Sequence, residues 1–397
     1  PSSKSVAHRA LIAAAFSEKP VKVKNIDFSN DIHATIDALK QIGVNFIVEK
    51  NSVLVDGSKI KLNCDINIDA NESGSTLRFL IPVASMLEKS VSFEGRGRLP
   101  ERPLNDYFEI FDKYGIDYSY PQGKYLPLTV SGDIKFDEVS VKGNTSSQFI
   151  TGLILCGLVN PVKVNITTEL QSKPYVDITV DVLRKFGCEI VEINNTYQIK
   201  KNKTLIDEYK VERDWSQAAF FMCAAAINGC VTLKDMNLDS SQGDREIISL
   251  LKKFGASVTI NGNDVTVVKS DMQGIDIDVE DIPDLVPTLA VLACYANGKT
   301  KIYNAARLRI KESDRLQAMY EELTKLGADI EIGEDYIVIN GGKPLCGGDV
   351  DSHNDHRIAM AMAVASVGCN GDINLSGYNA VSKSYPNFFD DWSSLNE

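Results

Sequence analysis

The chain has 397 residues, 44% of them hydrophobic, and its 42 Lys and Arg against 54 Asp and Glu give a formal net charge of −12. This length predicts two or three domains with large buried cores, and the acidic balance argues against a surface that coats nucleic acid. No run of about 18 uncharged apolar residues is present, so no membrane span is expected. The eight cysteines are scattered without a C-x-x-C pair, which favours a reducing compartment and therefore a cytoplasmic protein.

A segment at 5–16 reads as a helix that is apolar on nearly every side. A helix with this character is buried. Similar segments start near residues 75, 145, 216, 285 and 356, so the sequence repeats with a period of roughly 70 residues. We therefore expect one buried helix in each of six repeats.

A second, amphipathic helix recurs in the same phase and ends at a glycine, at positions 43, 115, 187, 255 and 327. Glycine just past the last helical residue is a common helix stop. A strand lies between the two helices, and two strands around a turn, as at 256–268, predict a hairpin after the second helix. The sixth repeat ends after its second helix, near 386–395, without a hairpin. We expect strands upstream of Pro1 to complete it.

Six repeats divide most naturally into two globular domains of three, at 1–211 and 212–397, joined by a short hinge near 210–214. The fold class is α/β (α+β), with buried helices in each core. The strand–helix–strand order predicts parallel pairs with right-handed crossovers, next to antiparallel hairpins.

Polar residues that can bind anions fall at the beginnings of the repeated helices. The free N–H groups there carry a partial positive charge, which favours an anion. If the helix starts of each domain point the same way, two facing domains gather them around one interdomain cleft, where we expect the active site. The cations expected there are Lys4, Arg9, Arg78, Arg102, Lys311, Arg315, Arg357 and Lys383. Such a site suits small molecules with phosphate and carboxylate groups, which arginine binds in bidentate fashion.

Two carboxylates, Asp284 and Glu312, stand among these cations. Because a carboxylate opposes anion affinity, each is interpreted as an acid–base group. The alternatives are that Asp284 caps the fifth buried helix and that His356 is structural. His8 and His353 are expected to be structural or exposed. The pair His353 and His356 lacks further ligands at metal-binding spacing, so no metal site is expected.

At these residues the chain resembles the EPSP synthase family, the 3-phosphoshikimate 1-carboxyvinyltransferases. The resemblance covers essentially the whole chain. Its motifs are SKSVAHRA at 3–10, SGSTLRF at 73–79, LPERP at 99–103, SSQF at 146–149, SKPY at 172–175, IPD at 282–284, KESDR at 311–315, NDHR at 354–357 and SKS at 382–384. It implies the family's inside-out α/β fold of two three-repeat domains that close on the substrates.

The resemblance also implies the reaction: the enolpyruvyl group of phosphoenolpyruvate passes to the 5-hydroxyl of shikimate 3-phosphate, and phosphate is released. No metal or organic cofactor is implied, and we expect a monomer without nucleic-acid or membrane partners. The residues implied to hold shikimate 3-phosphate are Lys4, Ser5, Arg9, Ser146, Ser147, Gln148, Ser172, Asp284 and Lys311. Those implied to hold phosphoenolpyruvate are Lys4, Gly74, Arg102, Gln148, Arg315, Arg357 and Lys383. Asp284 resembles the base and Glu312 the acid, helped by Lys4 and His356.

The chain departs from the family pattern at Glu72 and Arg307, where the family often has Asn, so substrate contacts there are not carried over. The related UDP-N-acetylglucosamine enolpyruvyl transferases carry Cys or Asp in the loop corresponding to 95–102, which here contains neither. A repeat-built clamp or scaffold around nucleic acid is the alternative outside the enzymes. It would show basic residues along exposed helix faces, whereas here they gather at helix starts.

Overall fold

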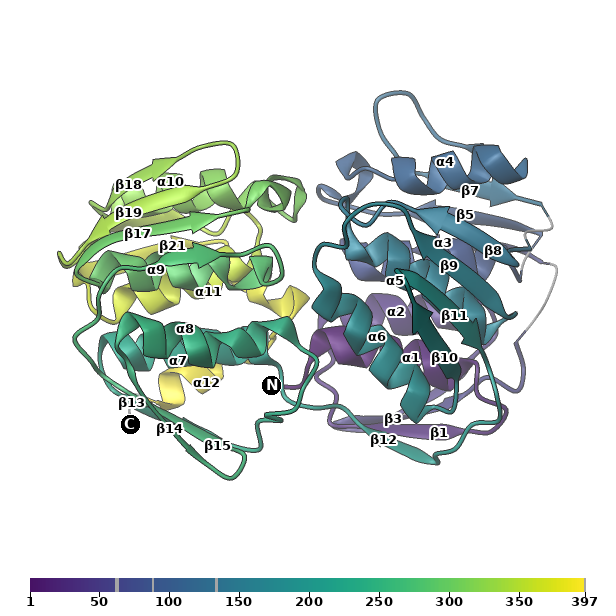
Figure 1. The fold of residues 1–397 in the computed structure, drawn as a ribbon, viewed down its shortest axis with the longest axis horizontal. Helices are drawn as coiled ribbons and strands as arrows, with labels where there is room; N and C mark the ends of the chain where they lie inside the picture. The colour runs from purple at the N-terminus through teal and green to yellow at the C-terminus, as the bar shows by residue number, and fades with distance from the viewer. Residues whose placement is uncertain (61–63, 88, 133–134, 396–397) are drawn as a thin grey trace. The chain divides into compact units, whose positions relative to one another are not determined.

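The computed structural model describes residues 1–60, 64–87, 89–132 and 135–395. The chain forms two compact units. Ser2–Glu212 is called here the N-terminal unit, and Arg213–Glu397 together with Pro1 is called the C-terminal unit. Both units are built from the repeats recognised in the sequence (Figure 1).

The N-terminal unit contains the first three repeats. The first comprises α1 (Lys4–Ala15), β1 (Val21–Lys24), α2 (Asn30–Gln41), β2 (Asn45–Val48) and β3 (Ser52–Asp56). The second comprises β4 (Asp65–Asp69), α3 (Gly74–Ser85), β5 (Ser90–Glu94), η1 (Leu99–Glu101), α4 (Asn105–Tyr114), β6 (Asp117–Ser119) and β7 (Leu128–Ser131). The third comprises β8 (Glu138–Val141), α5 (Ser147–Leu155), η2 (Cys156–Leu158), β9 (Val162–Ile166), α6 (Lys173–Lys185), β10 (Glu189–Ile193) and β11 (Thr196–Lys200), and is followed by β12 (Glu208–Lys210).

The C-terminal unit contains the other three repeats. The fourth comprises α7 (Trp215–Ile227), β13 (Cys230–Leu233), η3 (Gly243–Glu246), α8 (Ile247–Phe254), β14 (Ser257–Asn261) and β15 (Asp264–Val268). The fifth comprises β16 (Asp276–Asp278), η4 (Pro283–Leu285), α9 (Val286–Tyr295), β17 (Gly298–Tyr303), η5 (Ala306–Ile310), α10 (Arg315–Lys325), β18 (Asp329–Ile332) and β19 (Ile337–Gly341). The sixth comprises β20 (Cys346–Asp351), α11 (His356–Ser366), β21 (Asn370–Ser376), η6 (Tyr378–Lys383) and α12 (Phe388–Ser394).

A complete sheet joins one parallel pair to one antiparallel hairpin, as in the order β4-β5-β7-β6. The predicted combination of parallel and hairpin strands is therefore confirmed. The sheet of the first repeat is completed by β12, which lies parallel to β1 in the order β12-β1-β3-β2. Since β12 is used there, β13 has no parallel neighbour among the described residues, a difference that the sequence pattern did not predict.

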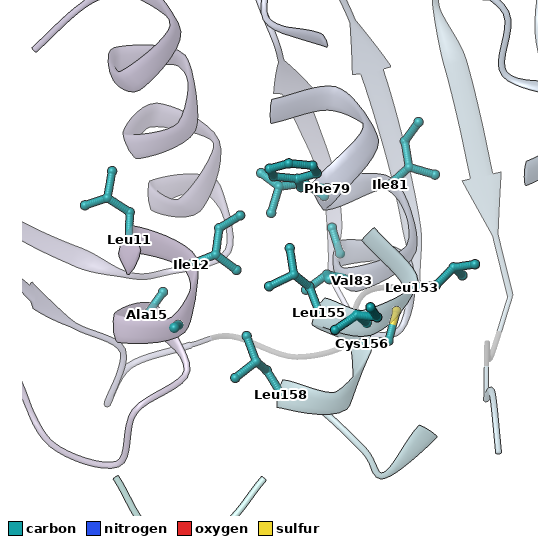
Figure 2. Packing of buried hydrophobic residues seen from close by; sticks show 14 of the residues in the cluster. Leu11, Ile12, Ala15, Phe79, Ile81, Val83, Leu153, Leu155, Cys156 and Leu158 are labelled. Atoms are coloured by element: carbon teal, nitrogen blue, oxygen red, sulfur yellow. The ribbon is translucent and has the colours of Figure 1, made fainter. Parts of the chain in front are cut away.

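The predicted buried helices form the two cores. In the C-terminal unit α7, α9 and α11 pack on one another, and in the N-terminal unit α3 packs on α5. Figure 2 shows Ile12 of α1, Val83 of α3 and Leu155 of α5 pointing into one apolar interior. Burying side chains of this size stabilises a fold by about 1.5–3 kcal/mol each. This is the physical reason that helices apolar on every face lie inside their units.

Serine side chains cap helix starts, and the predicted glycines follow helix ends. Ser3 caps α1 and Ser73 caps α3, each accepting a hydrogen bond from a backbone N–H of the first turn. The stop glycines Gly115 and Gly255 have φ values of 65° and 95°, a conformation that glycine adopts without steric cost. The third buried helix, α5, ends at Leu155, and the buried Cys156 begins a 3₁₀ turn. Among the described residues, no helix combines the length and apolar character needed to cross a bilayer.

Candidate active site

In the N-terminal unit, a lysine at the start of α1 forms an ion pair with an aspartate of α2. Lys4 is the first residue of α1, and its Nζ lies 2.5 Å from Oδ2 of Asp31 near the start of α2. Both side chains are largely buried, with 16% and 12% exposed. The sequence predicted Lys4 as a site residue, but it did not predict Asp31.

Arg9 is a buried cation whose hydrogen bonds go to neutral acceptors. Its Nε donates to Oγ1 of Thr179 at 2.7 Å, and its Nη groups donate to the carbonyls of Ser5 at 2.6 Å and Tyr175 at 2.9 Å. The guanidinium carbon lies 4.8 Å from the centre of the Phe79 ring. Burial lowers the pKa of Arg9 to about 9. Among the described residues no carboxylate pairs with Arg9, so an anion would find an unneutralised charge there.

The starts of α5 and α6 carry the predicted serines. Ser146 caps α5 by accepting from the backbone N–H of Gln148, whose side-chain Nε2 donates to Oγ of Ser75 at 3.2 Å. Ser147 is the first residue of α5 and is buried. Ser172 precedes α6 with φ of 53° and is also buried. These helix starts therefore combine backbone N–H groups with hydroxyl donors, as an anion site requires.

Arg102 and Gly74 lie in contact. A Cβ atom on Gly74 would stand 2.5 Å from Nη1 of Arg102, so the guanidinium packs directly against the glycine at the start of α3. Arg102 is 8% exposed. Arg78, further along α3, is buried, donates to the Pro103 carbonyl at 3.0 Å and lies over the ring of Phe149.

In the C-terminal unit, Asp284 is held by two arginines. Its Oδ1 accepts from Nη1 of Arg315 and its Oδ2 accepts from Nη2 of Arg357, each at 2.9 Å. Nζ of Lys311 lies 3.7 Å from Oδ1 of the same carboxylate. The alternative that Asp284 caps α9 is wrong, because the residue before α9 is Leu285 and Asp284 lies within η4.

Arg315 joins Asp284 to two further carboxylates. Its Nη2 donates to Glu312 at 2.7 Å, and its Nε donates to Asp355 at 2.8 Å. Burial alone would lower the pKa of Arg315, but the charges of Asp355, Glu312 and Asp284 raise it. Burial alone would raise the pKa of Asp355, but the charge of Arg315 lowers it. Arg315 is 1% exposed and stays charged inside this cluster.

The start of α11 completes this set. Asp355 caps the helix by accepting from the backbone N–H of Arg357, and His356 is its first residue, 2% exposed with Nδ1 3.7 Å from Oδ1 of Asp355. Lys383, at the end of η6, donates from Nζ to the Asn354 carbonyl at 2.6 Å. The structure therefore brings Asp284, Lys311, Glu312, Arg315, His356 and Arg357 to or next to the starts of η4, α10 and α11. Lys383 contacts this group from the end of η6.

His8 and His353 have structural partners. His8 is fully buried and its Nδ1 lies 2.7 Å from Oγ1 of Thr35, as the structural prediction required. His353 contacts Glu322, with 2.6 Å between Nε2 and Oε1, and Glu321 lies close by. The sequence spacing did not predict this group. Its buried member, Glu322, also accepts from Lys325 and from the Asp351 N–H, so an ammonium group already balances its charge.

Asp244 is a buried carboxylate that sequence reasoning missed. It lies in η3, is 3% exposed and accepts a hydrogen bond from the Ser216 hydroxyl at the start of α7. Burial and the nearby charge of Asp284 raise the pKa of Asp244 to about 7. The repeat could have revealed it, since Asp31 and Asp244 occupy the same position in the first repeat of each unit.

Sequence comparison relates the whole chain to one family. A sequence profile of the family described as EPSP synthase (3-phosphoshikimate 1-carboxyvinyltransferase) matches residues 1–392. Proteins named 3-phosphoshikimate 1-carboxyvinyltransferase are 49% identical in Clostridium novyi and 47% identical in Clostridium acetobutylicum. Each alignment covers 100% of this chain and 94% of the relative.

Solved structures agree with the sequence comparison. The EPSP synthase of Acinetobacter baumannii matches with a TM-score of 0.80 and 27% identity, covering 100% of this chain and 94% of that one. The enolpyruvyl transferase NikO of Streptomyces tendae matches with a TM-score of 0.80 at 16% identity, covering 100% and 93%, a likeness of fold alone. The predicted enolpyruvyl transferase-like fold is confirmed. The chain belongs to the EPSP synthase (3-phosphoshikimate 1-carboxyvinyltransferase) family.

Proposed function

We propose that this protein transfers the enolpyruvyl group of phosphoenolpyruvate to the 5-hydroxyl of shikimate 3-phosphate and releases phosphate. The observation that carries the proposal is the Asp284 carboxylate held by Arg315 and Arg357, in a chain whose relatives are named for this transfer. A carboxylate held ionised by two arginines can accept a proton, and arginines beside it can bind an anionic substrate.

In this proposal shikimate 3-phosphate is bound largely by the N-terminal unit. Among the described residues, the hydrogen bonds of Arg9 go to neutral acceptors. Its charge therefore favours a bound anion, because a buried cation is stabilised by a nearby opposite charge. Lys4 and the starts of α5 and α6 supply further donors. The full proposed set is Lys4, Ser5, Arg9, Ser146, Ser147, Gln148 and Ser172, with Asp284 and Lys311 near the reacting hydroxyl.

Phosphoenolpyruvate is bound mainly by arginines and lysines at or near helix ends. Arg102, packed on Gly74, and Arg357 are the proposed principal ligands, because a guanidinium can bind a carboxylate or phosphate through two hydrogen bonds. Lys4, Gln148, Arg315 and Lys383 complete the set. Since the donors of Arg315 already serve three carboxylates, its contact with substrate exchanges one of those bonds for a bond to the ligand.

The chemistry is an addition followed by an elimination. Asp284 takes the proton of the 5-hydroxyl while the hydroxyl oxygen bonds to C2 of phosphoenolpyruvate, and Glu312 protonates the methylene carbon C3. In the tetrahedral intermediate that forms, the bond from C2 to the phosphate oxygen then breaks, and the leaving phosphate takes up the proton held by Asp284. C3 returns its proton to Glu312, which restores the double bond. Lys4 and His356 assist these proton transfers.

The proposal includes a monomeric enzyme of the cytoplasm without a nucleic-acid partner. The absence of a nucleic-acid partner is supported by composition: the net charge is −12, and proteins that bind nucleic acid usually carry a basic excess. All eight cysteines are free thiols in the structure, and free thiols are typical of proteins in a reducing cytosol.

The direct test is release of inorganic phosphate from phosphoenolpyruvate with shikimate 3-phosphate as acceptor. We expect stoichiometric phosphate and a new enolpyruvyl ether, detected by its vinyl proton resonances. UDP-N-acetylglucosamine serves as the control acceptor and should give neither. Phosphate release with that acceptor, or with no acceptor, would contradict the proposal.

A further inference from the structure

Asp31 and Asp244 occupy equivalent positions in the first repeats of the two units. Asp31 is the second residue after Ser29, the N-cap of α2, and Asp244 is the second residue after Gln242, the N-cap of η3. Each accepts a hydrogen bond from the start of the buried helix of its own repeat. The two carboxyls are therefore internal counterparts, and the contacts of each can be compared directly.

The two counterparts differ in their charge partner. Asp31 is neutralised by Lys4, the first residue of α1. The first residue of α7 is Trp215, which cannot neutralise a carboxylate, and the group that contacts Asp244 is the hydroxyl of Ser216. A carboxylate buried without a cation favours its protonated form.

The charged groups that act on Asp244 belong to other elements of the same unit. Asp244 is 3% exposed. Its Oδ2 accepts a hydrogen bond from the Ser216 hydroxyl, and its Oδ1 has no hydrogen-bond partner among the described residues. The charges acting on it are Asp284 of η4, Arg357 of α11 and Asp214 before α7. On its own element Arg245 and Glu246 are exposed. Burial and Asp284 raise the pKa of Asp244 to about 7, while Arg357 opposes this shift.

Arg357 connects Asp244 to the anion site. It donates to Oδ2 of Asp284 at 2.9 Å and to the Asp284 carbonyl at 3.2 Å, and its charge acts on Asp244. An anion bound to Arg357 would therefore share the charge of this arginine with the carboxyl groups of Asp244 and Asp284. Like charges near one site disfavour joint ionisation, so the bound anion should return a proton to Asp244.

We infer that Asp244 is a proton-linked positioning residue of the anion site at Arg357, protonated when the anion is bound and ionised when the empty site stands in mildly alkaline solution. This inference rests on the proposed function, in which Arg357 binds phosphoenolpyruvate. The proton comes from the buffer, and no covalent bond changes. By linkage, affinity for phosphoenolpyruvate falls by up to about tenfold per pH unit once Asp244 ionises in the empty site.

The test is calorimetric titration of phosphoenolpyruvate into the full chain at about pH 8, where the ligand phosphate is fully ionised, in two buffers of different ionisation enthalpy. We expect binding to take up close to one proton. Asp244→Asn should take up almost none and should bind with an affinity that changes little with pH. The matched control is Asp239→Asn, an exposed carboxylate of the same segment, which should behave as the unaltered protein does.

A second variant tests the inference independently of the folding of Asp244→Asn. The Ser216 hydroxyl donates to Asp244 and lowers its pKa, so Ser216→Ala should move the pH at which affinity begins to fall upward. Equal proton uptake in the unaltered protein and Asp244→Asn, or no shift in Ser216→Ala, would overturn the inference while leaving the proposed function intact. If the unaltered protein does not bind phosphoenolpyruvate, both fail.

Discussion

Arg9 of the N-terminal unit and Arg315 of the C-terminal unit are both buried, but different groups accept their hydrogen bonds. Arg9 donates to two hydroxyls and two carbonyls, and burial lowers its pKa to about 9. Arg315 donates to Asp284, Glu312 and Asp355, whose charges raise its pKa despite burial. Under the proposed function, the N-terminal unit keeps the charge of Arg9 for an anionic ligand, whereas the C-terminal unit uses that of Arg315 to hold carboxylates that can exchange protons.

The largest effect that this contrast predicts is on turnover. If the acid–base groups belong to the C-terminal unit, Asp284→Ala should lower kcat by about 10²–10⁴-fold, the range typical of a lost general base. Affinity for shikimate 3-phosphate should remain nearly unchanged. Steady-state phosphate release and calorimetry measure the two quantities. Asp281→Asn, an exposed acid of the same loop, is the control; full activity in Asp284→Ala would remove this carboxylate from the reaction.

The next effect is on stability, and it separates the two arginines directly. Arg315→Met leaves three carboxylates without their shared cation, which should cost about 3–5 kcal/mol, as removal of one partner from a buried ion pair does. For a unit of this size that lowers Tm by about 6–20 °C. Arg9→Met removes a cation that pairs with no carboxylate among the described residues, so its Tm should change by only a few degrees or rise. Scanning calorimetry without ligand measures the Tm of each variant. An equal loss of Tm in Arg315→Met and Arg9→Met would contradict the contrast between the two arginines.

A smaller effect concerns which substrate each variant loses. Arg357→Ala should weaken phosphoenolpyruvate by about 10–150-fold, because a hydrogen bond to a charged group contributes about 1.5–3 kcal/mol. Shikimate 3-phosphate should lose far less affinity, since its proposed ligands lie mostly in the N-terminal unit. Calorimetry with each substrate gives the order. Arg9→Lys is the matched variant of the other unit and should show the reverse order; the same order in both variants would refute the assignment.

The smallest effect is steric. Gly74→Ala introduces a Cβ atom 2.5 Å from the present position of Nη1 of Arg102, so the guanidinium must move. Because a displacement of about 1 Å can cost a large part of a positioned interaction, we expect the KM for phosphoenolpyruvate to rise about tenfold. Stability should change little. Ser85→Ala, a small change at the far end of the same helix, is the control, and an unchanged KM in Gly74→Ala would show that Arg102 does not bind this substrate.

Much of the architecture follows from local pattern. Helices such as 5–16 and 356–366 are apolar on all sides, and only a core can accept such a surface, so their burial could be predicted. The glycines that end α4 and α8 predicted the helix stops for a conformational reason. The position of Arg357, Asp284 and Lys4 at helix starts followed from the repeat phase, which is a property of spacing along the chain.

Which cation meets which carboxylate did not follow from spacing. The contact of Arg315 with Asp355 joins residues 40 positions apart, and the pairing of β12 with β1 joins the two ends of the N-terminal unit. The burial of Asp244 next to Asp284, like the contact of His353 with Glu322, also depends on how separate repeats pack. Periodicity specifies the face of each element that turns inward. The residue that packs against each face is set by the tertiary structure, because close packing joins residues far apart in the sequence. The same packing determines the protonation of each carboxyl group.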